Sequence, residues 1–207
     1  MAFMLIVGCT PQTSAPQQQS QEEGRAVFTI TDAAAEMGTV TSIKVTIEKV
    51  QIHSSAEGWI TLDSTPKTYD LLELKAQGSH ALLADANVTE GTYDQMRLDV
   101  SSVIVTDANG DHDAKLPSSE LKLKDDVIIK DGTTTATTFD FIADESLHTT
   151  GKGEYILAPV IELETHEDAV VAVRENKVTI NSGKSMGKIK HGMDVSGNID
   201  VGVKIPT

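Results

Sequence analysis

The segment at 106–115, TDANGDHDAK, carries oxygen-bearing side chains at alternate positions, namely Asp107, Asn109, Asp111 and Asp113. Looped calcium sites are built from carboxylate and amide oxygens with this spacing. An EF-hand would have Gly in place of His112 and Glu in place of Ser118, so the segment is not an EF-hand. The alternative is a solvated hairpin tip that turns at Asn109-Gly110. We expect no cofactor, and calcium is the one candidate.

The only cysteine, Cys9, ends the sequence Ile6-Val7-Gly8-Cys9. A bacterial-type lipoprotein signal ends in an aliphatic residue, a small or β-branched residue, then Gly, Ala or Ser, and then the lipidated cysteine. Residues 10–24, TPQTSAPQQQSQEEG, contain no aliphatic side chain larger than Ala. They bury too little apolar surface to offset the entropy of ordering, and we expect a disordered tether. The pattern predicts an extracytoplasmic protein held at the membrane by a lipid on Cys9.

The front of this signal departs from the usual form. A secretory signal needs a basic region and an apolar stretch of about 7–15 residues. Only MAFMLIV precedes Gly8, and it has no Lys or Arg. We therefore expect Met1 to be an internal start and residues 1–9 to be the end of a longer signal. The alternative is a cytoplasmic protein with an apolar N-terminus and a chance cysteine, which explains neither the motif nor the tether.

The sequence offers little that would mark an enzyme. NSGKS at 181–185 resembles the end of a phosphate-binding loop, but Val178 stands where that loop needs Gly. There is no Gly-x-Ser-x-Gly elbow, and the six histidines show no catalytic spacing. Asp140, Asp144 and Glu145 could form an acid pair, although carboxylates on an outer strand face and the following turn explain them better. We expect no catalysis.

Three further positions have expected roles. Asn87-Val88-Thr89 is an N-glycosylation sequon before a turn. Tyr93 follows the turn at Gly91, and such a tyrosine often closes a sandwich corner through its hydroxyl. Arg97 is expected on the same strand face as Tyr93, opposite Met96, where it would pair with a carboxylate.

Composition excludes some partners and suggests a boundary. The net charge of −14 argues against nucleic acid as a partner, because phosphate backbones repel such a chain. One cysteine excludes an internal disulfide and a Cys-based zinc site. Residues 166–207 carry six basic and five acidic side chains, whereas residues 1–165 carry eleven basic and 26 acidic ones. The composition therefore changes near Thr165.

Apolar residues recur with period two, which is typical of half-buried strands. Candidate strands lie at 25–31, 40–54, 91–107, 133–143 and 154–165. The alternation changes phase near Glu48-Lys49 and near Ser101-Ser102, which predicts a β-bulge at each place. Short strands separated by Gly-containing turns predict a β-sandwich.

Two segments and the tail differ from this pattern. Residues 32–38 indicate one helical turn, and residues 68–88 indicate a short helix or loop segments that plug one end. Residues 166–207 predict hairpins that turn at Glu175-Asn176 and at 196–198. Isolated hairpins of Val and Ile are marginal in water, so we expect the tail to dock on the acidic sandwich.

Several segments occur in an order that resembles a known family, among them TYDLLEL, GTYDQMRLDV, FDFIADESL and YILAPVIELET. The chain resembles domain-of-unknown-function family 4382, found on prokaryotic surface lipoproteins, over about residues 24–165. The resemblance implies a prealbumin-like, antiparallel, seven-strand β-sandwich. It implies no active site.

These observations divide the chain into a signal remnant (1–9), a tether (10–24), a β-sandwich (25–165) and a β-hairpin extension (166–207). They predict a lipid-anchored module of the cell envelope that binds an envelope or extracellular ligand or has a structural role. The alternatives are a self-assembling surface subunit and a hydrolase with an unrecognised carboxylate site.

Overall fold

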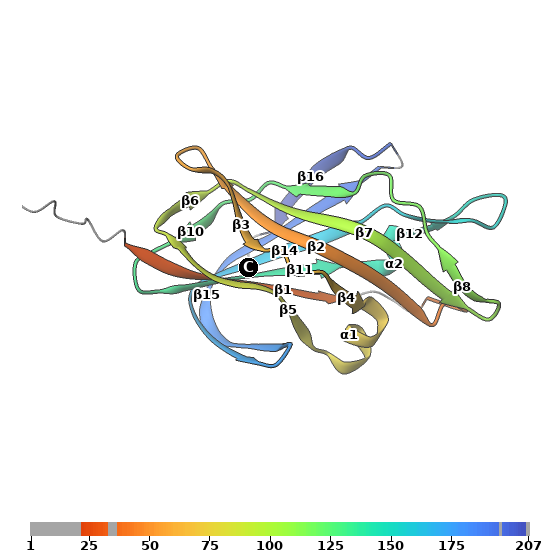
Figure 1. Ribbon diagram of the computed structural model, residues 1–207, viewed down its shortest axis with the longest axis horizontal. Coiled ribbons are helices and arrows are strands. Elements are labelled where there is room, and N and C mark those ends of the chain that lie inside the picture. Colours follow the sequence, from red (N-terminus) through yellow and green to blue (C-terminus); the bar gives the residue numbers. More distant parts are fainter. Residues whose placement is uncertain (1–21, 33–36, 195, 206–207) are drawn as a thin grey trace, which may run out of the picture.

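The computed structural model describes residues 22–32, 37–194 and 196–205, and of residues 200–205 only the backbone. Two β-sheets pack face to face, with short helices at the margin (Figure 1). Cys9, most of the expected tether and most of the expected helical turn at 32–38 lie outside the described residues. No described helix is long and apolar enough to cross a membrane.

The first sheet has the strand order β14-β11-β1-β5-β15-β16. Its strands are β1 (Glu23–Asp32), β5 (His80–Thr89), β11 (Thr134–Phe141), β14 (Val160–Arg174), β15 (Lys177–Met193) and β16 (Ile199–Ile205). The pairing of β1 with β11 is parallel, and the other pairings in this sheet are antiparallel. The expected all-β fold is confirmed, but one pairing is not antiparallel, because about a hundred residues separate β1 from β11 and no hairpin dictates their direction.

The second sheet contains β2 (Ser42–Ser54), β3 (Gly58–Asp63), β4 (Lys67–Asp70), β7 (Gln95–Asp107), β8 (Gly110–Asp113) and β9 (Glu120–Leu123). Two small pairs are β6 (Gly91–Tyr93) with β10 (Val127–Ile129), and β12 (Leu147–Thr149) with β13 (Tyr155–Leu157). The helices are α1 (Leu71–Gln77) and α2 (Ala143–Ser146).

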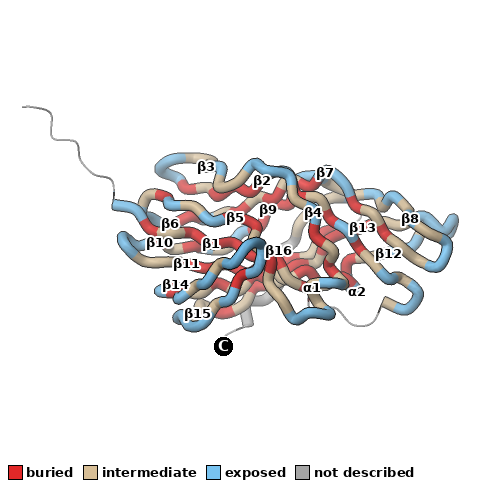
Figure 2. Tube along the Cα trace, turned by 60° about the horizontal axis from the view of Figure 1, so that its bottom comes forward, coloured by how far each residue is buried: buried red, intermediate tan, exposed pale blue. Residues whose placement is uncertain are grey.

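The main core lies between the two sheets. Alternate residues of each strand point inward, as with Phe28 and Ile30 of β1, which are fully buried. The rings of Phe28 and Phe139 lie 5.4 Å apart between centroids. Figure 2 shows the buried residues along the middle of the strands and the exposed ones gathered at the turns. The period-two pattern is thus explained by one buried face per strand.

Both expected β-bulges are confirmed. The register of β2 against β7 shifts on either side of Ile47, so that Ser101 and Glu48 have no residue directly opposite. Each extra residue returns the apolar side chains that follow it to the buried face.

The segment at 68–88 holds a helix and also a strand that the sequence analysis missed. Asp70 caps α1 by accepting hydrogen bonds from the N–H groups of Leu72 and Glu73, and Gly78 ends it at φ 55°. β5 follows directly and pairs with β1. Its sequence, HALLADANVT, is rich in Ala and Leu, which favour helices, and tertiary pairing overrides that preference.

The C-terminal hairpin of β14 and β15 wraps over the outer face of the first sheet. β14 pairs with β11 up to His166 and then bends at Asp168, whose φ is 50°. The tip reaches β5, where Lys177 lies opposite Ala81 and Val178 opposite His80. β14, β11, β1, β5 and β15 therefore form a closed ring, because β15 also pairs with β14.

A second, smaller core fills one end of this ring. Val27, Ala136, Ala169 and Val178 are buried together there. The expected β-rich tail thus covers the sandwich. The expected boundary at Thr165, however, lies inside β14, which continues to Arg174. The change in net charge along the sequence therefore does not mark a structural boundary, because the strand is continuous through Thr165.

Candidate functional site: an acidic recess beneath the C-terminal hairpin

A recess of about 290 Å³ opens between the outer face of the first sheet and the C-terminal hairpin. Its charged and titratable lining side chains are Asp32, Asp140, Glu162, Glu164, His80 and Lys188. They come from β1, β11, β14, β5 and β15, so the recess exists only after the ring of strands has closed.

Strand register places Asp140, Glu162, Glu164 and Lys188 in two adjacent rows. One row runs across the sheet through Thr29, Thr138, Glu164 and Lys188, and the next runs through Thr31, Asp140, Glu162 and Lys190. All lie on the face opposite the main core, because they alternate with buried residues such as Ile161 and Leu163. The outer face of the sheet is therefore polar where the smaller core of Val27, Ala136, Ala169 and Val178 ends.

Lys188 lies among the recess carboxylates. Its Nζ donates to Glu162 Oε1 at 2.8 Å and lies 3.5 Å from Glu164 Oε2. The hydrogen bond to Glu162 is the main cause that raises the pKa of Lys188, so its ammonium stays charged. The recess therefore already stabilises one positive charge, and its remaining carboxylates leave it negative.

His80 forms the wall on the β5 side. Its Nδ1 lies 3.5 Å from the hydroxyl of Thr29, which donates to the hydroxyl of Thr138 at 3.1 Å. Burial lowers the pKa of His80, and nearby Glu164 opposes this shift only in part. Because the His80 imidazole is neutral, the net charge of the recess is set by the carboxylates and Lys188.

A second buried histidine, His191, fixes the same hairpin to the other side of the sandwich. It is 1% exposed, and its Nε2 lies 3.0 Å from the carbonyl oxygen of Lys124 in the β9–β10 connection. Burial is the main cause that lowers its pKa below 6.5. The folded protein therefore favours the neutral forms of both His80 and His191.

We expect stability to fall as the pH drops below about 6.5, the ordinary pKa of histidine. The unfolded chain binds protons there before the folded chain does, so acid favours unfolding until the lowered pKa values are passed. Urea unfolding of wild type and His191→Gln between pH 8 and 5 measures this. The variant should show a flatter dependence of unfolding free energy on pH. Equal slopes for the two proteins would contradict the assignment.

The segment considered for calcium forms the β7–β8 hairpin tip. Asp107 Oδ1 accepts from the Asn109 N–H at 2.7 Å, and Oδ2 accepts from the Tyr155 hydroxyl at 2.9 Å. These bonds, the one from Asn109 first, lower the pKa of Asp107 to about 2. Asp111 accepts from the Thr106 hydroxyl at 2.7 Å, and Asp113 is exposed. Across the described residues, no three His, Cys, Asp or Glu side chains are placed to hold a metal ion.

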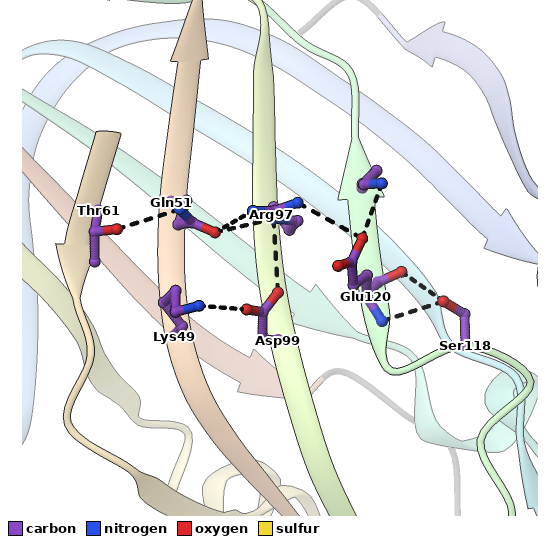
Figure 3. A network of polar contacts seen from close by, with 8 residues as sticks. Lys49, Gln51, Thr61, Arg97, Asp99, Ser118 and Glu120 are labelled. Atoms are coloured by element: carbon purple, nitrogen blue, oxygen red, sulfur yellow. Dashed lines mark hydrogen bonds and ion pairs between the residues drawn. The ribbon is translucent and has the colours of Figure 1, made fainter. Parts of the chain in front are cut away.

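Arg97 is the centre of a polar network on the outer face of the second sheet (Figure 3). Its Nε donates to Gln51 Oε1 at 3.0 Å, and its guanidinium lies 3.6 Å from a carboxylate oxygen of Asp99 and of Glu120. The guanidinium carbon also lies 4.5 Å from the ring centroid of Trp59. These contacts join neighbouring strands, as expected for a structural arginine.

Tyr93 does not share the face of Arg97. Its ring is buried in the main core, because Asp94 breaks the strand between β6 and β7 and resets the alternation. Its hydroxyl donates to the Thr89 carbonyl at 2.9 Å across the turn. Asn87 is exposed on β5, two residues before that strand ends.

The carboxylates considered for a hydrolase do not line one site. Only Asp140 lines the recess. Glu145 lies 2.6 Å from Lys190 Nζ, and Asp144 is exposed on α2. The sequence analysis missed His80, Glu162, Glu164 and Lys188. Their one sequence signal is charge alternating with apolar residues, Glu-Leu-Glu at 162–164 and Lys-Ile-Lys at 188–190.

The architecture is that of an all-β sandwich closed on one face by a hairpin. The family model described as "Domain of unknown function (DUF4382)" matches residues 23–159, and the chain belongs to this family. No curated protein and no solved structure matches the chain. The matched residues include Asp32, His80 and Asp140 but end before Glu162, so the recess is built partly by the family domain and partly by the hairpin that follows it.

Proposed function

We propose that this chain is a lipid-anchored, extracytoplasmic binding module of the cell envelope, and that its recess takes a small cationic ligand. The observation that carries the proposal is the recess itself, a hollow lined by four acidic residues and one lysine. A negative concave site attracts cations, because its walls focus the field into the opening. Binding without catalysis is the proposed role.

The chemistry of the ligand follows from Lys188. The Lys188 ammonium lies between Glu162 and Glu164. The walls of the recess are therefore suited to a ligand cation of the same size and hydrogen-bonding capacity. Hydroxyls of Thr31 and Thr138 line the same space and offer further hydrogen bonds. An organic amine that carries polar groups suits such walls, and a volume of this size suits a small molecule.

The proposed anchor suits the position of the recess. β1 begins at Glu23, so the last two residues of the expected tether (10–24) belong to this strand, and it ends at Asp32 in the wall of the recess. A ten-residue strand spans about 30 Å, so the recess lies roughly that far from the point where the tether enters the fold. Figure 1 shows β1 running along the sandwich toward the side of α1. A lipid on Cys9 would thus leave the recess at the end of β1 that is distant from the tether.

Lipidation is tested in cells that express the precursor with its natural upstream sequence. A fatty-acid probe should label wild type, and Cys9→Ser should remove the label and release the protein from the membrane fraction. Ser14→Ala, in the same tether, is the matched control and should label like wild type. Equal labelling of wild type and Cys9→Ser would refute the anchor and leave the recess to be tested separately.

A further inference from the structure

The outer part of β14 has an open edge. Up to His166 one edge of β14 pairs with β11 and the other pairs with β15. From Val170 to Arg174 the strand pairs only with β15, among the residues that the structure describes. The four pairs from Val171 to Arg174 are in unbroken register with β15. The hairpin therefore presents a regular strand whose second edge is unoccupied.

Between residues 169 and 173 this edge has no charged side chain or proline, and its register against β15 shifts on either side of Val170. Natural edge strands carry Lys, Pro or inward-pointing charges. Residues 169–173 read Ala-Val-Val-Ala-Val, with no charge and with β-branched side chains that favour strands. Val170 is 57% exposed and is the one large hydrophobic residue so exposed in the described part of the chain. The composition favours addition of another strand.

The position of the turn shows which residues of β14 direct their N–H and C=O groups to the open edge. Glu175 and Asn176 form a two-residue turn, so Arg174 and Lys177 are the hydrogen-bonded pair that flanks it. Alternate residues of an antiparallel strand direct their N–H and C=O groups to opposite edges. Val171 and Val173 therefore direct theirs to the open edge.

We propose that a second copy of this chain pairs antiparallel with this edge, about a two-fold axis at Val171. Val171 then faces Val171 of the second copy through a hydrogen-bonded pair, and Val170 faces Ala172. Val173 faces Ala169 of the second copy, so Val170 and Val173 each meet an alanine. The surface is self-complementary, as a two-fold interface requires.

Charge complementarity between Arg174 and Asp168 favours this register. It also favours a second copy of the chain as the partner. The same axis places Arg174 of each copy next to Asp168 of the other. Arg174 is exposed and has no ion pair in the described part of the chain, and Asp168 is exposed with Lys130 Nζ 4.0 Å away. A shift of the register by two residues places Asp168 against Ala172 and loses both ion pairs. The register that pairs Val with Ala therefore also pairs opposite charges.

An interface of seven residues on each side, 168–174, is small and falls in the weak, transient class. Copies anchored in one membrane would meet at high local concentration, which offsets weak affinity. This inference concerns self-association and is independent of what the recess binds.

Sedimentation velocity of the full chain with Cys9→Ser, over a range of concentrations, tests the association. The parent should show a reversible monomer–dimer equilibrium. Val170→Lys and Arg174→Glu should each weaken dimerisation by roughly tenfold, because the two-fold axis repeats every unfavourable contact. Thr179→Lys adds the same charge to the exposed face of β15, away from the open edge, and should leave dimerisation unchanged. A parent that stays monomeric, or a dimer that neither edge variant weakens, would overturn the proposal.

Cross-linking tests the register without a destabilising change. Val170 and Ala172 are both exposed on the outer face, and opposed residues of a non-hydrogen-bonded pair lie close enough for a disulfide. Mixing Val170→Cys with Ala172→Cys chains, each with Cys9→Ser, should give a mixed dimer on mild oxidation. Val170→Cys mixed with Thr179→Cys should not. Equal cross-linking in both mixtures would reject the register.

Discussion

Truncation of the chain after Thr165 is expected to abolish cooperative folding. The family match ends at residue 159, yet the first sheet depends on the strands that follow. Without β15, the edge of β14 loses its partner, and the main core loses Ile189 and Met193. His191, which is almost fully buried beside Lys124, is lost as well.

The expected magnitude follows from ordinary core losses. Removal of one large buried aliphatic side chain costs about 2–5 kcal/mol, and a domain of this kind is stable by roughly 5–15 kcal/mol. The truncated chain should therefore be insoluble or lack a cooperative thermal transition by circular dichroism. A chain that ends after Asp194 keeps the β14–β15 hairpin and is the control, with a lowered but cooperative transition. A Thr165 truncation that melts like the full chain would show that the hairpin is an independent arm.

Phe139→Ala should destabilise the protein by about 3–5 kcal/mol. Phe139 is fully buried on β11, and its ring packs against Phe28 of the neighbouring parallel strand. Removal of the ring leaves a cavity between β1 and β11. Among the described strands, these two are the paired strands that lie farthest apart in the sequence. Urea unfolding measures the change, with Thr179→Ala as the exposed control that should change the free energy of unfolding by less than about 0.5 kcal/mol. A loss below about 1 kcal/mol for Phe139→Ala would contradict the packing described here.

The sequence predicted local features well, because they depend on neighbouring residues. The phase changes at Glu48 and Ser101 predicted two bulges, and the turn at Glu175-Asn176 predicted the C-terminal hairpin. It failed at β5, where Ala and Leu favour a helix and only the pairing with β1 makes a strand. It also failed at Tyr93, since the interruption at Asp94 cannot be read from alternation alone.

The recess could not be predicted, because its residues meet only through long-range pairing. His80 and Glu164 come together when the hairpin bends at Asp168 and its tip reaches β5. Neither the positive φ of Asp168 nor the return to β5 has a distinctive sequence signal. A family member that lacks this hairpin would lack the wall formed by Glu162, Glu164 and Lys188, so the ligand is expected to differ among members.

The most direct test of the proposed function is isothermal titration calorimetry of the full chain with putrescine, spermidine, ethanolamine and choline at low and moderate salt. At least one amine should bind, more weakly as salt rises. Asp140→Asn and Glu164→Gln should each reduce its affinity by roughly tenfold or more, the loss expected when one charged contact is removed. Glu154→Gln, which neutralises an exposed carboxylate outside the recess, should bind like wild type. No binding of any of these cations, or binding that Asp140→Asn and Glu164→Gln leave intact, would contradict a cation-binding recess.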